Sequence, residues 1–350
     1  MRPLFQRFPS LERVLANNGF AHLPTPVQQH TIDGKPLWVK RDDLSHSTYG
    51  GNKVRKLELI LPEAQRLGAR RVVTFGATGT HHGLATAVFC KQLGLECEVL
   101  LFDQPVTELV QENIQMLAVQ GATLKHCGSL GSTLWRFYLH PGRLSRKNYF
   151  LFAGGSNVVG VLAFINAALE LKQQIDRGEC PEPARIYCPA SSNATLAGLT
   201  LGVALAGMKT EVVGVRVAPA KVGPFDSCTV KAVRALMQQT VKWLQKHGAD
   251  WNVPAPAPQI QDDWYGAGYG HPYEAADNAA RVFEASVGVP LDPTYTAKCV
   301  AAVLADKTPG EIMYWHTLSS MPLAPLREGF EIQSVPASLK PQLSPSALSY

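Results

Sequence analysis

From about Leu37 onward, short apolar runs alternate with longer segments of helical periodicity. Apolar strands that alternate with helices are typical of parallel sheets covered by helices on both faces. The sequence therefore predicts an α/β protein built from two doubly wound open sheets. The expected strands cover 37–40, 71–76, 98–102, 149–152, 185–188, 211–215 and 312–315. Five helices are expected: one that starts at about 53, one through 84–89, one through 109–117, a long one that ends at about 174, and one over 195–205.

Size and composition narrow the class of protein. The chain has 350 residues, which suits two domains, and 46% hydrophobic residues are enough for a large core. The net charge of +5 is spread in pairs such as Arg70-Arg71, so nucleic acid binding is not expected. We expect no membrane segment, because no apolar run has the required length and the N-terminus lacks a signal-peptide core. Seven cysteines without a CxxC pair indicate reduced thiols in a cytoplasmic protein.

Lys53 is the most informative residue for chemistry. It follows Gly50, Gly51 and Asn52, and an amphipathic run begins immediately after it. Two glycines allow a tight turn and asparagine is a good N-cap, so Lys53 is expected in the first turn of a helix. The positive end of the helix dipole disfavours an ammonium group there, and Arg55 adds to that effect. An amine biased toward its neutral form is what Schiff-base chemistry requires.

Two further loops each join a strand to a helix, where ligands collect in open α/β sheets. The loop 76–83 carries Thr80 and His81, and its amides can bind a carboxylate, although helix capping explains Thr80 equally well. His81 and His82 point to different faces of a helix, so no shared metal is expected. The second loop can hold a phosphate at a helix N-terminus, although a simple Ser/Asn-rich cap explains it equally well. Its residues are Ser191, Ser192, Asn193, Ala194 and Thr195.

Three late segments carry aromatic or hydroxyl side chains. Tyr269 lies in the glycine-rich turn 265–270, and Tyr295 lies in 291–298, which enters a helix. A loop tyrosine more often packs than reacts. Thr317 follows the last expected strand and places a hydroxyl at another carboxyl end. Each of these signals is modest when it is taken alone.

Taken together, the motifs resemble one family, that of D-cysteine desulfhydrase and 1-aminocyclopropane-1-carboxylate (ACC) deaminase. These are pyridoxal 5′-phosphate (PLP) enzymes related to the tryptophan synthase β-subunit (fold type II). The resemblance covers about 8–318 and rests on six segments in the family's order: 40–44 (KRDDL), 49–58 (YGGNKVRKLE), 154–157 (GGSN), 265–270 (YGAGYG), 291–296 (LDPTYT) and 316–317 (HT).

The resemblance implies a PLP Schiff base on Lys53, helped by Asn52, and a phosphate site in the loop from Ser191 to Thr195. It implies that Thr80 contacts the substrate carboxylate and that His81 lies beside the PLP hydroxyl. Tyr269 and Tyr295 match active-site tyrosines, and Thr317, or less favourably Thr296, meets the ring nitrogen. It also implies a homodimer with a large PLP-binding domain of 1–47 plus 160–335 and a small domain of 48–159 that carries Lys53. The Pro/Ser-rich tail, 336–350, is expected to be poorly ordered.

The expected activity is that of a PLP-dependent lyase, which removes a β-substituent and ammonia from a small amino acid to give a 2-oxo acid. Within the resemblance, ACC deaminase has a glutamate where this chain has Thr296 and a leucine where it has Thr317, so the pair is desulfhydrase-like. A hydroxyl at the ring nitrogen gives a weaker electron sink than a carboxylate, which suits β-elimination. ACC ring opening, β-replacement and a PLP-binding protein without turnover remain alternatives. The departures Gly79-Thr80-His81 and Leu318 leave the substrate open.

Overall fold

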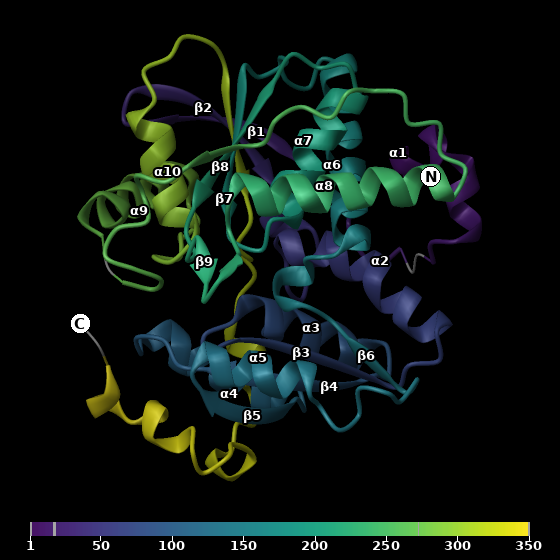
Figure 1. Cartoon of the computed structure of the whole chain (residues 1–350). Coiled ribbons are helices and arrows are strands. Elements are labelled where there is room, and N and C mark those ends of the chain that lie inside the picture. Colours follow the sequence, from purple (N-terminus) through teal and green to yellow (C-terminus); the bar gives the residue numbers. More distant parts are fainter. Residues whose placement is uncertain (1, 17–18, 272, 349–350) are drawn as a thin grey trace. The chain divides into compact units, whose positions relative to one another are not determined.

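The computed structural model describes residues 2–16, 19–271 and 273–348. The chain divides into two compact units (Figure 1). Unit 1 comprises Met1–Leu59 with Ser156–Met321, and unit 2 comprises Ile60–Gly155 with Pro322–Tyr350. Both units contain parallel sheets with helices packed on them, as the alternation of strands and helices predicts.

Unit 1 is built on a six-stranded sheet. The strand order is β1 (Val27–Ile32), β2 (Lys35–Arg41), β12 (Ile312–His316), β7 (Arg185–Ala190), β8 (Glu211–Arg216) and β11 (Gln259–Gln261). All neighbours are parallel except β1 and β2, which form an antiparallel pair. β1 was not expected from the sequence, because its polar residues Gln28, Gln29 and His30 hide the alternation typical of a strand.

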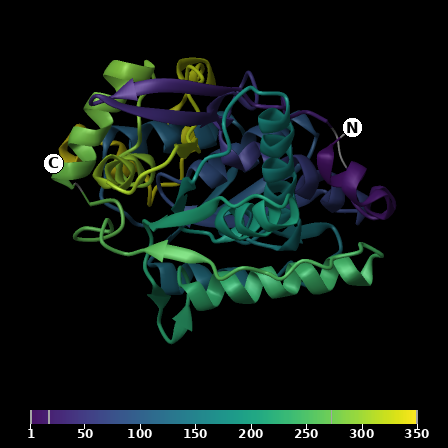
Figure 2. The same ribbon diagram turned by 90° about the horizontal axis from the view of Figure 1, so that it is seen from above.

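The two faces of this sheet bury separate cores. Met313 and Trp315 pack into the first core with α6 (Val158–Asp176), α7 (Ala194–Leu205) and α8 (Val230–Lys246). Tyr314, which lies between them on β12, packs into the second core with α9 (Glu274–Val287) and α10 (Thr296–Ala305). Successive side chains of a strand point to opposite faces, so one strand serves both cores. In Figure 2, α8 (green) and the β1–β2 ribbon (purple) lie on opposite sides of unit 1.

The helix α6 differs from the expectation that no segment has the length and apolar composition of a membrane span. It is long and apolar enough to cross a membrane by length and composition, whereas no such stretch was expected. However, 67% of its most apolar window is buried. Gly198 and Gly202 of α7 let the two helices approach closely, since an added Cβ would lie 2.5 Å from the Val161 oxygen or 2.6 Å from the Ala168 Cβ. The apolar length of α6 is therefore explained by its place in the core of unit 1.

Unit 2 has a four-stranded, fully parallel sheet. Its order is β5 (Thr123–Gly128), β4 (Glu96–Phe102), β3 (Arg71–Ala77) and β6 (Asn148–Phe150). The helices α3 (His81–Gln92), α4 (Glu108–Val119) and α5 (Leu130–Tyr138) connect these strands, and α11 (Ala324–Arg327) packs on α4. The small hairpin of β9 (Lys221–Val222) and β10 (Phe225–Asp226) belongs to unit 1, as does the short α1 (Pro3–Arg7).

The units differ from the expected domain limits. The long helix α2 (Asn52–Arg66) is continuous through Pro62, and its first part, including Lys53, belongs to unit 1. The reason is that Arg55 is held by Asp42 and Glu170 of unit 1. The tail also differs from a poorly ordered segment in its described part. Leu339 is fully buried, and the Gln111 amide donates to the carbonyls of Gln342 and Ser344 within unit 2. Residues 349–350 of that tail lie outside the described residues.

Candidate active site

The start of α2 is packed so closely that only glycine fits. A Cβ on Gly50 would lie 1.7 Å from the Asp43 carbonyl oxygen, and one on Gly51 would lie 2.6 Å from the Thr317 carbonyl oxygen. Gly51 also has φ of +95°, which disfavours any other residue. The Asn52 amide then donates to the Thr317 carbonyl at 3.1 Å. The first turn of α2 is therefore fixed against the segment that follows β12.

A chain of two hydrogen bonds leads from Lys53 to the start of α7. The Lys53 Nζ donates to the Asn52 Oδ1 at 2.7 Å, and the Asn52 Nδ2 donates to the Thr195 Oγ1 at 3.2 Å. Asn52 was expected to cap α2, but it is the first residue of the helix and its side chain is directed to Thr195. Residues 52 and 195 are far apart in sequence, so this contact brings together two of the segments singled out above.

Burial lowers the pKa of Lys53 from 10.5 to about 8, although the charge of Asp292 opposes the shift. The direction agrees with the expectation, but the cause differs, because loss of hydration dominates. Arg55 was expected to add to the shift by repulsion, but its charge is balanced by Asp42 and Glu170. The Lys53 amine is thus partly neutral near physiological pH, as nucleophilic chemistry requires.

This lowered pKa gives a testable prediction. In the cofactor-free protein, the rate of Lys53 acylation by an amine-specific reagent should rise with pH around a midpoint of about 8. A free lysine derivative, whose pKa is about 10.4, serves as the reference reaction. Peptide mass spectrometry after short exposures over pH 6 to 11 measures both rates. A midpoint at or above that of the free amine would contradict the effect of burial.

The loop after β7 forms the start of α7. Asn193 has φ of +64°, an uncommon value for a residue other than glycine, and its Nδ2 donates to the Ser227 carbonyl at 2.6 Å. The first amides of a helix have no partner within the helix and attract anions. The loop from Ser191 to Thr195 therefore has the geometry of an anion site, and Thr195 joins it to Asn52.

Tyr269 and Tyr295 lie against each other in unit 1, and their hydroxyl groups are hydrogen-bonded. The ring planes meet at 79° with centroids 5.8 Å apart. Burial raises the pKa of Tyr269 to about 12, and burial together with Tyr269 raises the pKa of Tyr295 well above its ordinary value. Both phenols therefore carry their protons at physiological pH. They can donate hydrogen bonds or a proton, and they are poorly suited to be bases.

Asp292 is a buried carboxylate that organises the turn before α10. Its oxygens accept from the amides of Thr294 at 3.0 Å, Tyr295 at 2.6 Å and Thr296 at 3.2 Å, and from the Thr296 Oγ1 at 2.7 Å. The hydroxyl of Thr296 is thus already bonded within its own turn. Lys298 on α10 donates to the carbonyls of Tyr265 and Gly268, which holds the glycine-rich turn that carries Tyr269.

His316 closes β12 directly before Thr317. Its Nδ1 lies 3.1 Å from the Tyr314 hydroxyl, and its Nε2 is buried without a hydrogen-bond partner among the described atoms. Burial lowers the pKa of His316 to about 4, so its imidazole is neutral at physiological pH. In a neutral imidazole one ring nitrogen donates a hydrogen bond and the other accepts one, and a change of tautomer reverses the two roles.

Thr80 and His81 belong to unit 2, at the start of α3. The Thr80 Oγ1 accepts from the Gly83 amide at 3.0 Å, so Thr80 caps α3. An added Cβ on Gly76 or Gly83 would lie about 2.5 Å from Thr80 atoms, so both glycines leave room for that side chain. Hydrogen bonds therefore connect Lys53, Asn52, Thr195 and Thr317, and separately Tyr269 and Tyr295, all within unit 1, whereas Thr80 and His81 lie in unit 2.

Sequence reasoning missed two site residues and one supporting cluster. Asp292 and His316 were quoted as parts of motifs, but no role followed from their positions alone. The cluster consists of buried charges behind Lys53, formed by Lys40, Asp42, Arg55 and Glu170. The sequence signal for it was a basic and two acidic residues, Lys40, Asp42 and Asp43, placed at the end of an apolar strand. A charge there is costly unless it is paired.

Comparison with known proteins agrees with this geometry. The model of the pyridoxal-phosphate dependent enzyme family matches residues 20–317. The D-cysteine desulfhydrase of Klebsiella pneumoniae (strain 342) is 29% identical over 326 residues, covering 89% of this chain and 94% of that protein. The D-cysteine desulfhydrase of Salmonella schwarzengrund (strain CVM19633) is 28% identical with the same coverage.

Two solved structures share the fold. An ACC deaminase homologue superposes with a TM-score of 0.75 at 24% identity and covers 93% of this chain and 99% of its own. A threonine deaminase from T.th. has a TM-score of 0.61 at 16% identity and covers 92% of this chain and 98% of its own. The expected fold type II architecture is confirmed by these neighbours. On the family match over residues 20–317, the chain belongs to the pyridoxal-phosphate-dependent enzymes.

Proposed function

We propose that this enzyme is a lyase of the D-cysteine desulfhydrase type, which removes a β-substituent from a small amino acid and, with water supplying the oxo oxygen, releases ammonia and a 2-oxo acid. The observation that carries the proposal is the hydrogen-bond chain from the Lys53 amine through Asn52 to Thr195. This chain joins a partly neutral amine to the start of a helix. A ligand that carries both an aldehyde, which reacts with the amine, and a phosphate, which binds at the helix N-terminus, suits this arrangement. The similarity to D-cysteine desulfhydrases over most of the chain supports the reaction class.

The residues of unit 1 fit PLP by their chemistry. Lys53 supplies the amine that combines with the aldehyde, and burial lowers its pKa to about 8, so that part of it is uncharged near physiological pH. The loop Ser191–Thr195 supplies helix amides and hydroxyls for the phosphate. Thr317 is favoured over Thr296 for the ring nitrogen, because the Thr296 hydroxyl is bonded to Asp292. When bound, PLP withdraws electrons from the Cα atom of the amino acid.

The proton transfers of the reaction are assigned to side chains of the protein. We assign to the Lys53 amine the removal of the Cα proton, which its lowered pKa permits. The paired phenols of Tyr269 and Tyr295 hold protons that they can donate to the departing β-substituent. Asp292 fixes the Tyr295 backbone through the amide hydrogen bond at 2.6 Å, which limits the movement of that phenol.

Two further roles are proposed for residues at the start of α3. We assign the substrate carboxylate to Thr80 and the amides at the start of α3, and the PLP hydroxyl to His81. The support is that Thr80 sits at a helix N-terminus, which attracts anions. A functional division into a PLP-binding domain and a small domain is part of the same proposal. The limits expected from the sequence, 1–47 with 160–335 and 48–159, stay a prediction, and Lys53 belongs to the same compact unit as the proposed phosphate loop. A homodimer, as the resemblance implies, and a place in the cytoplasm complete the proposal; the seven free cysteines support the cytoplasm.

The test is to locate the covalent adduct. Borohydride reduction of the enzyme followed by peptide mapping should place the pyridoxyl group on the peptide that contains Lys53. A panel of L- and D-amino acids with β-leaving groups should then give a 2-oxo acid and ammonia from at least one of them. An adduct on another lysine would refute the assignment of Lys53. If an added thiol diverted the product into a new amino acid, the reaction would be β-replacement and the proposed elimination would be refuted.

A further inference from the structure

Unit 2 exposes an apolar surface on α5 and the loop after it. Trp135, Tyr138 and Leu139 follow the i, i+3, i+4 spacing of one helix face and are 69%, 53% and 58% exposed. Leu144 in the loop is 97% exposed. Another side of α5 is buried through Phe137, whose ring packs against that of Phe75 at an angle of 60° in the core of unit 2. Because that side already supplies the core of unit 2, the outer apolar residues are not needed for folding.

The segment that carries these apolar residues is basic. The chain has no aspartate or glutamate between Glu112 and Glu170. Four exposed cations lie in this stretch, which also carries the apolar residues: Arg136, Arg143, Arg146 and Lys147. None of the four is within 4.0 Å of a carboxylate in the described part of the chain. The Arg143 guanidinium is also held over the rings of Phe150, at 4.4 Å, and Phe137, at 5.3 Å. We call these four cations together with Trp135, Tyr138, Leu139 and Leu144 the α5 face.

The positive charge of the α5 face indicates which kind of partner can bind to it. In a symmetric dimer the same patch faces itself, so four cations would meet four cations. Like charges brought together at an interface are unfavourable, which argues against a second copy of this chain. A partner of opposite charge that also accepts isolated apolar side chains fits both properties. A lipid interface accepts Trp and Leu side chains without a matching pocket, and anionic headgroups attract Arg and Lys.

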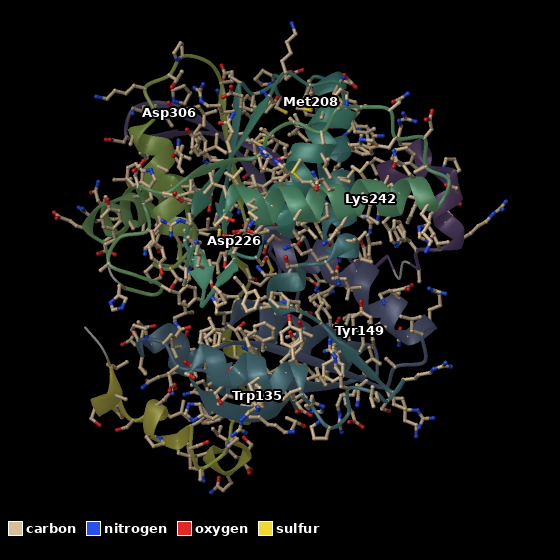
Figure 3. All side chains as sticks on the ribbon, in the orientation of Figure 1. Trp135, Tyr149, Met208, Asp226, Lys242 and Asp306 are labelled. Carbon is tan, nitrogen blue, oxygen red and sulfur yellow. The ribbon has the colours of Figure 1, made fainter. Side chains whose placement is uncertain are left out.

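We propose that the α5 face docks this enzyme on the surface of membranes that contain anionic lipids. Trp135 and Leu144 enter the interface, and the four cations meet the headgroups (Figure 3 labels Trp135). The attachment is peripheral and reversible, since a few apolar side chains and a few cations bind far more weakly than a spanning helix. It is independent of the reaction proposed above.

The test is co-sedimentation of the full-length holoenzyme with vesicles of phosphatidylcholine alone and with about 30% phosphatidylglycerol. Binding is expected only to the anionic vesicles. Arg136→Glu with Arg146→Glu should reduce the partition coefficient by at least about twentyfold, since each cation near an anionic surface contributes about a factor of five. The matched control is Lys242→Glu with Lys246→Glu on α8 of unit 1, which should leave binding unchanged (Figure 3 labels Lys242).

A second pair of variants tests the apolar part. Leu144→Ser should weaken binding to the anionic vesicles several-fold, whereas Leu67→Ser, at a half-exposed leucine elsewhere in unit 2, should not. Equal binding to neutral vesicles, or full binding by the double Arg variant or by Leu144→Ser, would overturn the proposal. A change of oligomeric state in Trp135→Ser, measured by analytical ultracentrifugation, would also overturn it, because the α5 face would then be a contact between subunits.

Discussion

Replacing Lys53 with alanine is expected to reduce elimination from D-cysteine and β-chloroalanine by at least about a thousandfold, the contribution typical of a well-placed general base. The loss follows from geometry and charge. The Lys53 amine is the group bonded to Asn52 and so connected to Thr195, and its pKa is lowered to about 8. The measurement is the rate of 2-oxo acid formation by the purified protein, with PLP present in excess.

Two controls make this result specific. Lys91→Ala removes an exposed lysine of α3 and should retain full activity. Added methylamine should restore part of the activity of Lys53→Ala, because a small amine can occupy the space of the missing side chain and accept the proton. Retention of ordinary turnover by Lys53→Ala would exclude the proposed mechanism. A protein that fails to bind PLP in any variant, including the controls, would point to a ligand-binding protein instead.

The alternation of buried strands and helices was predictable because it depends on local patterns, although β1, β5 and β11 were not among the expected strands. Buried parallel strands such as β3 and β8 are continuous apolar runs, and the helices between them have clear periodicity. The strand order was not predictable from these patterns. β12 lies between β2 and β7 although it follows them by more than a hundred residues, and only tertiary packing selects that position. The amphipathic α8 lay outside the expected list of helices, since no chemical motif drew attention to it.

The candidate site shows the same division between local and distant information. Gly50 and Gly51 predicted a tight turn. The structure explains the need for glycine at both positions, because Asp43 and Thr317 leave no room for a Cβ. The cause of the Lys53 pKa was not visible in sequence. Helix dipole and neighbouring charge are local properties, whereas burial depends on residues brought in from distant segments. For the same reason, the hydrogen bond from Asn52 to Thr195 could be found only in three dimensions.

Arg55→Met is expected to destabilise unit 1 by about 3 to 5 kcal/mol, the usual cost of removing one partner from a buried ion pair. The Arg55 guanidinium donates to both oxygens of Asp42 and to both oxygens of Glu170 at 2.7 to 2.9 Å, and all three residues are at most 3% exposed. Lys40 also bonds Glu170 at 2.7 Å, so the variant would leave two buried carboxylates with one cation. Methionine keeps most of the apolar volume, so the loss reports on charge. Urea denaturation of the cofactor-free protein measures the free energy of unfolding.

The pH dependence separates this electrostatic effect from simple packing. Burial raises the pKa of Glu170, but Arg55 and Lys40 outweigh it and hold the pKa at about 2, below the ordinary value of 4.5. A depressed carboxyl pKa stabilises the fold above the unfolded value, and this stabilisation is lost as the pH falls toward the folded value. The difference between wild type and Arg55→Met should therefore be largest near neutral pH and shrink from pH 4.5 toward pH 2. A difference that stays constant over this range would show that Arg55 acts through packing alone.

Arg66→Met is the matched control, because Arg66 lies on the same helix in an exposed pair with Glu63. It should leave the free energy of unfolding unchanged within error, since exposed ion pairs contribute little. Arg55 lies two residues after Lys53, and its bonds to Asp42 and Glu170 hold the first turn of α2 in unit 1. If that turn is held by the buried charges, Arg55→Met should also move the acylation midpoint of Lys53 from about 8 toward the value of a free amine, whereas Arg66→Met should not. A shift in both variants would assign the lowered pKa to the helix as a whole, and a shift in neither would assign it to the close packing at Gly50 and Gly51.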